Sequence, residues 1–306
     1  MYKAITKQAK YFKSSFGITL LALPAILFIF VFSYVPLYGL VLPFKEYNFT
    51  QGFWGSPWIG FTNFEFLFNS DLLHIVRNTL MMNSLFIVIN VLVEVTVALL
   101  LFELGKRATK TYQTILFLPF FISWIVVSYA VYGFLDPDIG IVNKMLAAFG
   151  NEPIMFYNDP KYWPYILVVA HVWKFLGYGT LMYYAALMGV DSEYYEAAKL
   201  DGANRFQQAI HISIPMIRPI IIIMVVLSIG SIFYADFGLF YSVPRDNAML
   251  YATTDVIDTY VYRALRVLGD FGMSSAAGLF QSVCGFILVL LSNYAIGKFS
   301  KDDKLF

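Results

Sequence analysis

Long apolar runs dominate this chain, and several of them reach the ~20 residues that a helix needs to cross the hydrocarbon core of a bilayer. Of its 306 residues, 59% are hydrophobic and 13% are charged, whereas about a quarter of the residues in a soluble domain are charged. Polar backbone groups inside a bilayer must be satisfied within the protein, which favours helices for such runs. The sequence therefore predicts an all-α integral membrane protein.

We place six transmembrane helices at about 17–42, 77–104, 112–134, 163–188, 214–235 and 274–297. Pro24 and Pro36 predict kinks in the first of them. Lys174 and the pair Gly177 and Gly179 make the fourth neither uniformly apolar nor straight. The lysine-rich N-terminus resembles the start of a signal peptide, but the apolar run after it is too long, and we interpret it as a retained first span.

Lysine and arginine are concentrated in the two tails and in the segments 105–111 and 189–213. Because positive residues accumulate on the cytoplasmic side, both termini and the 189–213 loop are expected in the cytoplasm. The outer segments are then about 43–76, 135–162 and 236–273, which are rich in aromatic residues, Gly, Pro and Asp. Their aromatic side chains fit an interfacial belt, a docking surface for an external protein, or both.

Known catalytic and nucleotide-binding patterns are missing from the sequence. Gly105-Lys106 and Gly297-Lys298 lack the upstream glycine of a P-loop, so no nucleotide site of that kind is expected. His74, His171 and His211 lie in different segments without metal spacing, and Cys284 has no partner cysteine. A net charge of +1 gives no reason to expect nucleic acid. The sequence predicts a protein that is not an enzyme and binds no cofactor or metal.

Few charges fall inside the predicted spans: Glu94, Lys174 and, at the outer end of the fifth, Asp236. Glu103 lies at a helix end and can reach the interface. An ion-coupled carrier needs several intramembrane charges, since each costs ~2.5–3.5 kcal/mol to insert. Glu94 could pair structurally with a neighbouring helix, or it could serve as a proton site. His171 could be a core histidine whose hydrogen bonds are satisfied, or it could be a functional residue. The energy for any transport is therefore expected from another subunit.

The segment 191–215 is a long polar interruption between the fourth and fifth spans. Asp191 or Ser192 can cap a helix, and Gly202 can end it in the left-handed conformation. Residues 203–210 resume a helical pattern, and Pro215 fits the first turn of the fifth span. The pattern predicts two short helices at an angle under the membrane, although an ordinary intracellular loop has a similar pattern.

The identities and spacing of the residues in 191–215 distinguish the pair of short helices from an ordinary intracellular loop. Glu196-Ala197-Ala198, three residues, Gly202, nine residues and then Ile212-Ser213-Ile214-Pro215 resemble the EAA motif, E-A-A-x3-G-x9-I-x-L-P. That motif belongs to the membrane subunits of ATP-binding-cassette (ABC) importers that work with a binding protein. Ile214 replaces the usual leucine, and Asp201 before the glycine is also typical.

Other segments extend the resemblance over nearly the whole chain. Residues 20–43, 55–64 and 77–80 are similar to the maltose-type (MalF-like) sugar permeases, and more narrowly to their LplB-like polysaccharide and oligosaccharide branch. The resemblance implies a type I ABC importer permease fold. It divides the chain into a tail, first span and outer loop (1–76), a core permease domain (77–297) with the EAA loop at 191–215, and a cytoplasmic tail (298–306).

The resemblance also implies a mechanism and a location. The family works in the bacterial cytoplasmic membrane with a second homologous permease, two cytoplasmic ATPases that bind ATP and Mg, and an extracellular solute-binding (lipo)protein. ATP-driven closure moves the EAA loops together, and the permease pair alternates between inward-facing and outward-facing states. By this resemblance the residues that transmit force, without catalysing anything, are Glu196, Ala197, Ala198, Asp201, Gly202 and Arg205.

The implied substrate is an oligosaccharide, which proteins hold with aromatic faces and hydrogen-bonding side chains. Our candidates are Trp173, Lys174, Tyr178, Tyr183, Tyr184, Tyr234 and Asp236, each of which could instead serve in helix packing or the belt. Lys174 could favour an acidic sugar or pair with an acid of the second permease. Alternatives are another solute such as glycerol phosphate, an ion-coupled secondary sugar carrier, or a membrane scaffold.

Overall fold

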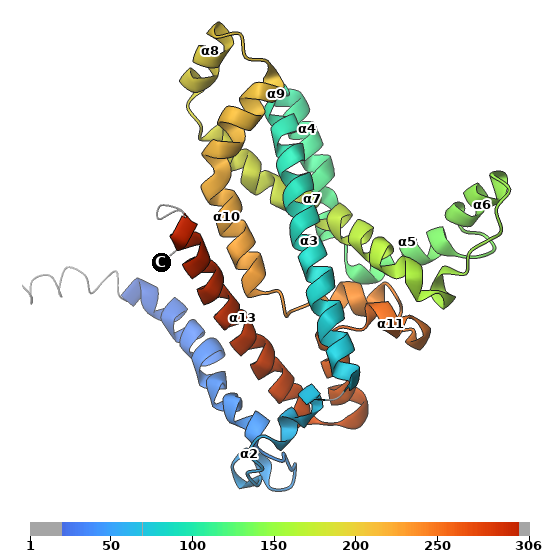
Figure 1. Ribbon diagram of the computed structural model, residues 1–306. Coiled ribbons are helices and arrows are strands. Elements are labelled where there is room, and N and C mark those ends of the chain that lie inside the picture. The colour runs from blue at the N-terminus through green and yellow to red at the C-terminus, as the bar shows by residue number, and fades with distance from the viewer. Residues whose placement is uncertain (1–19, 69, 300–306) are drawn as a thin grey trace, which may run out of the picture. The chain divides into compact units, whose positions relative to one another are not determined.

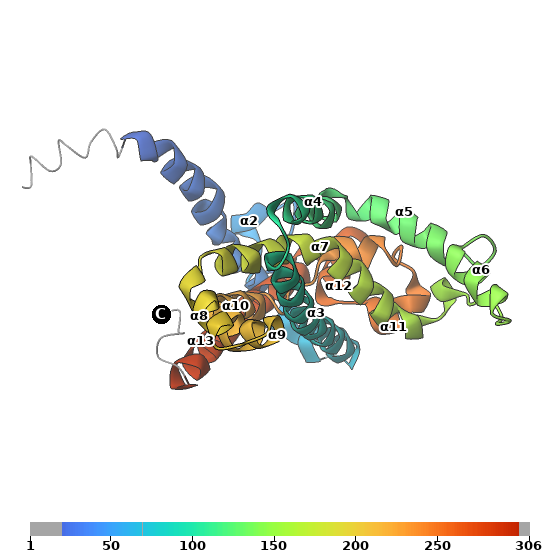
Figure 2. The same cartoon turned by 90° about the horizontal axis from the view of Figure 1, so that it is seen from above.

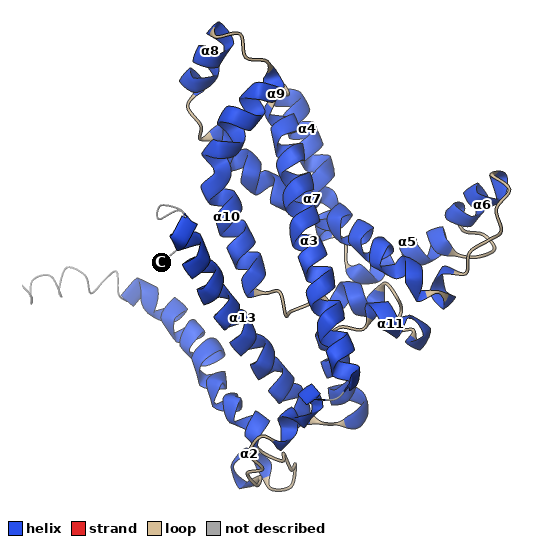
Figure 3. Ribbon diagram, viewed as in Figure 1, coloured by secondary structure: helices blue, strands red, loops and turns tan. Residues whose placement is uncertain are grey.

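The computed structural model describes residues 20–68 and 70–299. Helices make up its regular structure, and no strand is assigned within those ranges (Figure 3). The chain forms two compact units, residues 1–63 and 64–306. The lysines of the predicted cytoplasmic tails, Lys3, Lys7, Lys10, Lys13, Lys301 and Lys304, lie outside the described residues.

The described part of the first unit begins with one apolar helical segment, Leu20–Phe44, and a loop follows in which Lys45 and Trp58 form an isolated bridge. The helix is α-helical at Pro24, becomes a π-helix at Phe30–Tyr34 and a 3₁₀-helix at Val35–Phe44. Pro24 therefore does not interrupt the helix, whereas Pro36, which has no amide hydrogen, lies where the hydrogen-bonding pattern changes. The Lys45 ammonium donates to the Phe53 (3.0 Å) and Trp54 (3.2 Å) carbonyls of the short helix α2 (Gly52–Gly55), which holds the loop together.

The second unit contains the remaining apolar helices, and five helices of the described chain, or six with one bent pair, are long and apolar enough to cross a membrane. Its long helices are α3 (Ser70–Phe102), α4 (Lys106–Phe117), α5 (Trp124–Leu135), α7 (Trp163–Met188), α10 (Ile214–Gly230) and α13 (Phe271–Phe299). The shorter elements are α6 (Ile141–Ala148), α8 (Ser192–Leu200), α9 (Arg205–Gln208), α11 (Tyr251–Thr254), α12 (Ile257–Arg263) and the 3₁₀ and π segments η4 (Leu118–Phe121), η5 (Phe156–Asn158), η6 (Pro160–Tyr162), η7 (Ala209–Ser213), η8 (Gly238–Ser242), η9 (Ala248–Leu250) and η10 (Ala264–Leu268). The 3₁₀-helix η3 (Thr62–Phe68) lies at the boundary between the two units.

Within this unit, α8 and α9 lie at the end opposite to the starts of α3 and α13 (Figure 1). In the view from above, α5 and α6 lead away from α8, α9 and α10 (Figure 2).

The third span, predicted as one helix at 112–134, is broken. Lys106–Phe121 and Trp124–Leu135 meet at an angle of 97°. Pro119 cannot donate a backbone hydrogen bond and so ends α4 in the 3₁₀ turn η4. The Ser123 side chain then accepts from the Val126 amide as the N-cap of α5.

The fifth span, predicted at 214–235, also differs, because its helix ends at Gly230 and residues 231–236 are irregular. Irregular backbone at membrane depth needs partners from the protein. Side chains of α3, α12 and α13 supply them: Asn83 donates to the Ile232 and Tyr234 carbonyls (2.6 and 3.1 Å), Gln281 donates to the Phe233 carbonyl (2.7 Å), and Asp258 accepts from the Ala235 amide (2.7 Å). Burial raises the pKa of the Asp258 carboxyl above its ordinary value.

At its other end the same helix begins earlier than predicted. Residues Arg205–Gly230 run without a break through the π-helical turn η7. The prediction of a separate short helix at 203–210 is therefore wrong, and Pro215 lies inside a continuous helix. A proline leaves a carbonyl of the preceding turn without its donor, and the π-helical turn directly before Pro215 accommodates this loss.

The fourth span, predicted at 163–188, coincides with α7 and is unbroken. Its glycines permit close approach of neighbouring helices. A β-carbon at Gly177 would overlap the Leu116 carbonyl of α4, and one at Gly179 would overlap the Glu94 carboxyl group of α3. The second unit therefore packs α3 and α4 directly against the backbone of α7.

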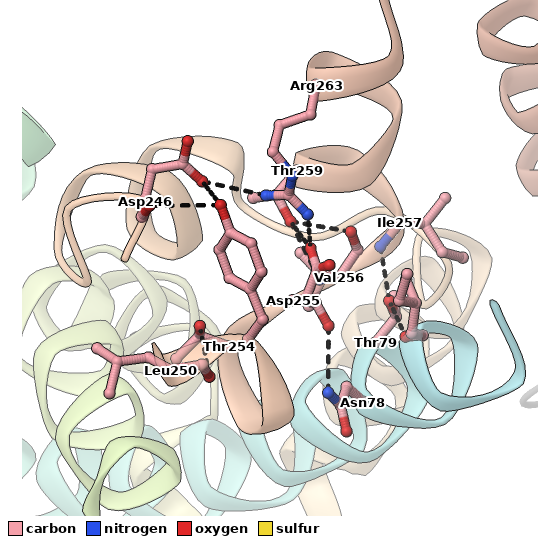
Figure 4. Close-up of polar contacts among 12 residues, drawn as sticks. Asn78, Thr79, Asp246, Leu250, Thr254, Asp255, Val256, Ile257, Thr259 and Arg263 are labelled. Atoms are coloured by element: carbon pink, nitrogen blue, oxygen red, sulfur yellow. Dashed lines mark hydrogen bonds and ion pairs between the residues drawn. The ribbon is translucent and has the colours of Figure 1, made fainter. Parts of the chain in front are cut away.

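The segment 236–273, which is predicted to lie outside, folds back on the start of α3 through a polar network (Figure 4). The Arg263 guanidinium bridges the carboxylates of Asp246 and Asp255 and lies 4.2 Å from the centre of the Tyr251 ring. Asn78 donates to the Asp255 carbonyl (3.2 Å), and Thr79 accepts from the Ile257 amide (3.0 Å). The Arg77-Asn78-Thr79-Leu80 segment thus fixes α11 and α12 against α3.

Candidate functional site

The turn between α8 and α9 has the local structure that its residues predict. Asp191 caps α8 by accepting from the Glu193 amide (3.1 Å). Gly202 has φ +82°, a conformation that side chains with a β-carbon rarely adopt. The Ala203 amide donates to the Ala198 carbonyl (2.9 Å), which is the hydrogen bond of a Schellman motif.

Two features that sequence reasoning missed hold this turn in place. Asn204 and Gln207 form a reciprocal capping box at the start of α9, with hydrogen bonds of 2.8 and 2.9 Å. The N-x-x-Q spacing before a helical run was the available signal. The hydroxyl groups of Tyr195 and Ser213 form a hydrogen bond (3.0 Å) in which either can be the donor. The Tyr195 ring packs on Phe102, with ring centroids 5.5 Å apart. The turn is therefore anchored to the ends of α3 and α10.

The six predicted coupling residues all lie at this turn. Ala198 is half-buried, and Glu196, Ala197, Asp201, Gly202 and Arg205 are exposed. Arg205 forms an ion pair with Glu103 at the end of α3 (2.7 Å), and so exposed a pair contributes at most about 1 kcal/mol. Leu200 and Phe206 beside them are 91% and 73% exposed. An exposed turn with large apolar side chains fits a protein interaction surface.

A cavity of about 300 Å³ lies between α3, α7, α10 and the irregular residues 231–236. That volume is at the lower end of the range for small-molecule sites. Its wall combines aromatic, polar and acidic side chains: Asn83, Phe86, Ile87, Asn90, Val91, Glu94, His171, Phe175, Tyr178, Gly179, Tyr183, Met224, Ser228, Ser231, Ile232, Tyr234 and Asp236.

The structure brings four of the seven predicted substrate-path residues to this cavity, namely Tyr178, Tyr183, Tyr234 and Asp236. Trp173 instead lines an apolar groove between α5 and α7. Tyr184 packs against the apolar cluster of Val95 and Leu187.

Lys174 is buried, and its ammonium faces the break in the third span. It donates to the carbonyls of Pro119 (3.3 Å), Phe120 (3.0 Å) and Ile122. An ammonium has three donors and no acceptor, so these carbonyls use its full capacity. Its position 5.2 Å from the centre of the Trp124 ring adds a cation–π contact. Lys174 thus stabilises the bend between α4 and α5.

Several polar residues of the cavity were not among the predicted substrate-path residues, although Glu94 and His171 were singled out from the sequence. Asn83, Asn90 and Glu94 lie on α3 at spacings of seven and four residues, which places them on one face of the helix. That spacing of polar residues in an apolar span was a usable signal. The Asn90 amide nitrogen lies 3.2 Å from His171 Nε2, and the His171 ring stacks on Phe86 with centroids 4.0 Å apart.

Comparison with known proteins identifies the family of this chain. Residues 100–300 match the family described as the binding-protein-dependent transport system inner membrane component. The chain belongs to this family. Protein LplB of Bacillus subtilis (strain 168) is 38% identical over 92% of the chain and 89% of that protein. The polygalacturonan/rhamnogalacturonan transport system permease protein YteP of the same organism is 34% identical over 92% and 88%.

Solved structures agree with this family. A chain in the crystal structure of a bacterial ABC transporter involved in the import of the acidic polysaccharide alginate matches with a TM-score of 0.86 and 31% identity, over 96% of this chain and 99% of that one. A second structure of such a transporter, in complex with an alginate pentasaccharide-bound periplasmic protein, matches with a TM-score of 0.85.

The predicted family and the all-helical permease fold are confirmed. The chain is a multi-pass inner-membrane permease of an ABC importer for sugars or oligosaccharides, and it is a non-catalytic subunit. Such a permease works with a second permease, ATPases and a binding protein. Among residues 20–68 and 70–299, no group of three or more His, Cys, Asp or Glu could hold a metal ion.

Proposed function

We propose that the core permease, residues 77–297, pairs with a second homologous permease to form an alternating-access path for an oligosaccharide. The exposed turn between α8 and α9 carries this proposal, since it presents the EAA residues on a rigid support at one end of the unit. In the proposed arrangement Glu196, Ala197, Ala198, Asp201, Gly202 and Arg205 contact an ATPase subunit. That end, and both termini, then lie in the cytoplasm, and the binding protein delivers sugar at the opposite end.

The cavity is the proposed substrate path through this subunit. Tyr178 and Tyr234 offer aromatic faces, and the carboxyl group of Asp236 offers hydrogen-bond acceptors. Asn83 and Asp258 hold the irregular residues 231–236 that form part of its wall.

Gly202→Val tests the coupling role. A β-branched residue at φ +82° costs about 1–3 kcal/mol if the turn keeps its shape, so the turn is expected to change shape instead. The expected result is an assembled complex with at least several-fold lower sugar uptake and lower stimulated ATP hydrolysis. Gly150→Val is the matched control, since Gly150 has a similar φ of +77° in an outer loop. Normal uptake by the Gly202 variant would refute the coupling role.

Glu196→Lys and Arg205→Glu test contact with the ATPase through reduced co-purification of that subunit. Because Arg205 also pairs with Glu103, Glu103→Gln serves as the control for loss of the internal ion pair alone. If all three variants retained the ATPase fully, these charges would face water rather than a partner.

A further inference from the structure

One acidic side chain of the cavity wall has unused hydrogen-bonding capacity. Glu94 on α3 is 7% exposed and lines the cavity, and it has no hydrogen bond or ion pair among the described residues. Its carboxyl group lies so close to the backbone of α7 that a β-carbon at Gly179 would overlap it. The carboxyl group is therefore enclosed between two helices of this subunit and reaches open space at the cavity.

Glu94 differs from the other unpaired polar groups of the wall. Asn90 Oδ1 and His171 Nδ1 are buried atoms that also find no hydrogen-bond partner among the described residues. Both are covered by neighbouring side chains, whereas the Glu94 carboxyl group is in contact with the cavity. Glu94 is therefore the group of these three that can meet a ligand without rearrangement of the wall.

The surroundings of Glu94 favour its neutral form. Burial of a carboxylate without a counter-ion is so costly that an isolated buried carboxyl group keeps its proton. Lys174 is not its counter-ion, because that ammonium donates to three carbonyls at the bend between α4 and α5 and interacts electrostatically with Asp236. A neutral carboxyl group offers one O–H donor and acceptor oxygens, which match the acceptor and the donor of a sugar hydroxyl group.

Glu94 and Tyr234 lie at opposite ends of the cavity. Asn83 on α3 donates to the Tyr234 carbonyl (3.1 Å), and Glu94 follows Asn83 by three turns of the same helix, or about 16 Å along its axis. That separation exceeds the length of one sugar ring, so a ligand that contacts both ends contains more than one ring. The cavity thus offers an oligosaccharide an aromatic face at one end and a hydrogen-bonding group at the other.

We infer that Glu94, as a neutral carboxyl group, is a specificity-determining residue that binds a hydroxyl group of the transported oligosaccharide. The inference rests on the proposed function and adds one contact and its protonation state. A site built to hydrogen-bond a hydroxyl group discriminates against a ligand that lacks it, because the buried polar group is then left unpaired. The contact does not depend on the charge of the sugar.

Two substitutions separate a neutral hydrogen-bonding group from an ionised one. Glu94→Gln keeps a donor and an acceptor in nearly the same shape but cannot carry a charge, whereas Glu94→Met keeps the length and removes both. Glu94→Gln is expected to bind sugar within about threefold of the wild type, and Glu94→Met about 5- to 100-fold more weakly. Thr96→Val, which removes an exposed hydroxyl group of the same helix outside the wall, should leave the affinity unchanged.

Sugar binding is measured by saturation-transfer NMR on the complete transporter in nanodiscs without its binding protein, so that only the transporter reports. The panel contains trigalacturonate, trimannuronate, α-1,4-galactotriose and β-1,4-mannotriose, with monodeoxy analogues of the member that the wild type binds best. One such analogue should lose affinity for the wild type and for Glu94→Gln, but not for Glu94→Met, which has no polar group there to leave unpaired. A merely structural role of Glu94 would not produce this difference.

The inference is overturned if Glu94→Gln binds sugar as weakly as Glu94→Met, which is the result expected of a carboxylate paired with a cation of the second permease. It is also overturned if no monodeoxy analogue distinguishes the wild type from Glu94→Met. Stimulated ATP hydrolysis confirms that each variant assembles. Uptake into proteoliposomes with the binding protein tests the proposed function separately, since a wild-type transporter that moves no saccharide of the panel would refute it.

Discussion

Lys174→Met removes the ammonium that holds the bend of the third span while keeping a long apolar side chain of similar length. In the wild-type protein three carbonyls of the segment 119–122 accept from this group. The Pro119 carbonyl also accepts from the Ile122 amide (3.1 Å), so the Phe120 and Ile122 carbonyls are the ones that depend on Lys174.

The expected loss follows from those two groups. A buried carbonyl left without a donor costs about 1–3 kcal/mol, so the variant should lose about 2–6 kcal/mol of unfolding free energy. Trp124 begins α5 directly after the bend and donates to Asp236 on the cavity wall. A displaced bend should therefore also lower sugar uptake.

Stability is measured by SDS titration of the purified subunit in mixed micelles, with tryptophan fluorescence as the signal. Lys144→Met on α6 is the control, because it removes a lysine that is exposed. If the Lys174 and Lys144 variants unfold with the same free energy, the ammonium does not stabilise the bend and the reasoning fails.

Three further perturbations test other parts of the structure. Arg263→Met leaves two carboxylates unpaired and should cost about 2–4 kcal/mol in the same titration, whereas exposed Arg266→Met should change little. A carboxyl whose pKa is raised on folding stabilises the folded state only at low pH, so Asp258 adds stability below about pH 4 that disappears as pH rises through its raised pKa. Asp258→Asn should flatten that dependence, and an unchanged pH profile would contradict it. Gly179→Ala should lower uptake, since a β-carbon there meets a carboxyl group, while Gly133→Ala, which meets open space, should not.

Local patterns predicted the elements whose structure depends on near neighbours in the chain. The fourth span was placed at 163–188 and coincides with α7. The Asp191 cap and the left-handed Gly202 were also predicted, because a cap and a positive φ are properties of a few adjacent residues. The break at Pro119 and Ser123 was equally local and was missed, because the apolar run continues through it.

The sequence by itself determined that this chain crosses a membrane several times as helices and that a turn at Gly202 lies between two of them, since length, hydropathy and turn residues act locally. Only the tertiary structure decided that α10 ends at Gly230, because Asn83, Asp258 and Gln281 from other helices satisfy the backbone beyond it. It also decided that Lys174 stabilises a bend while Glu94 faces the cavity. An intramembrane charge acts through whichever distant groups the fold brings within hydrogen-bonding distance, and those groups lie far away in the sequence.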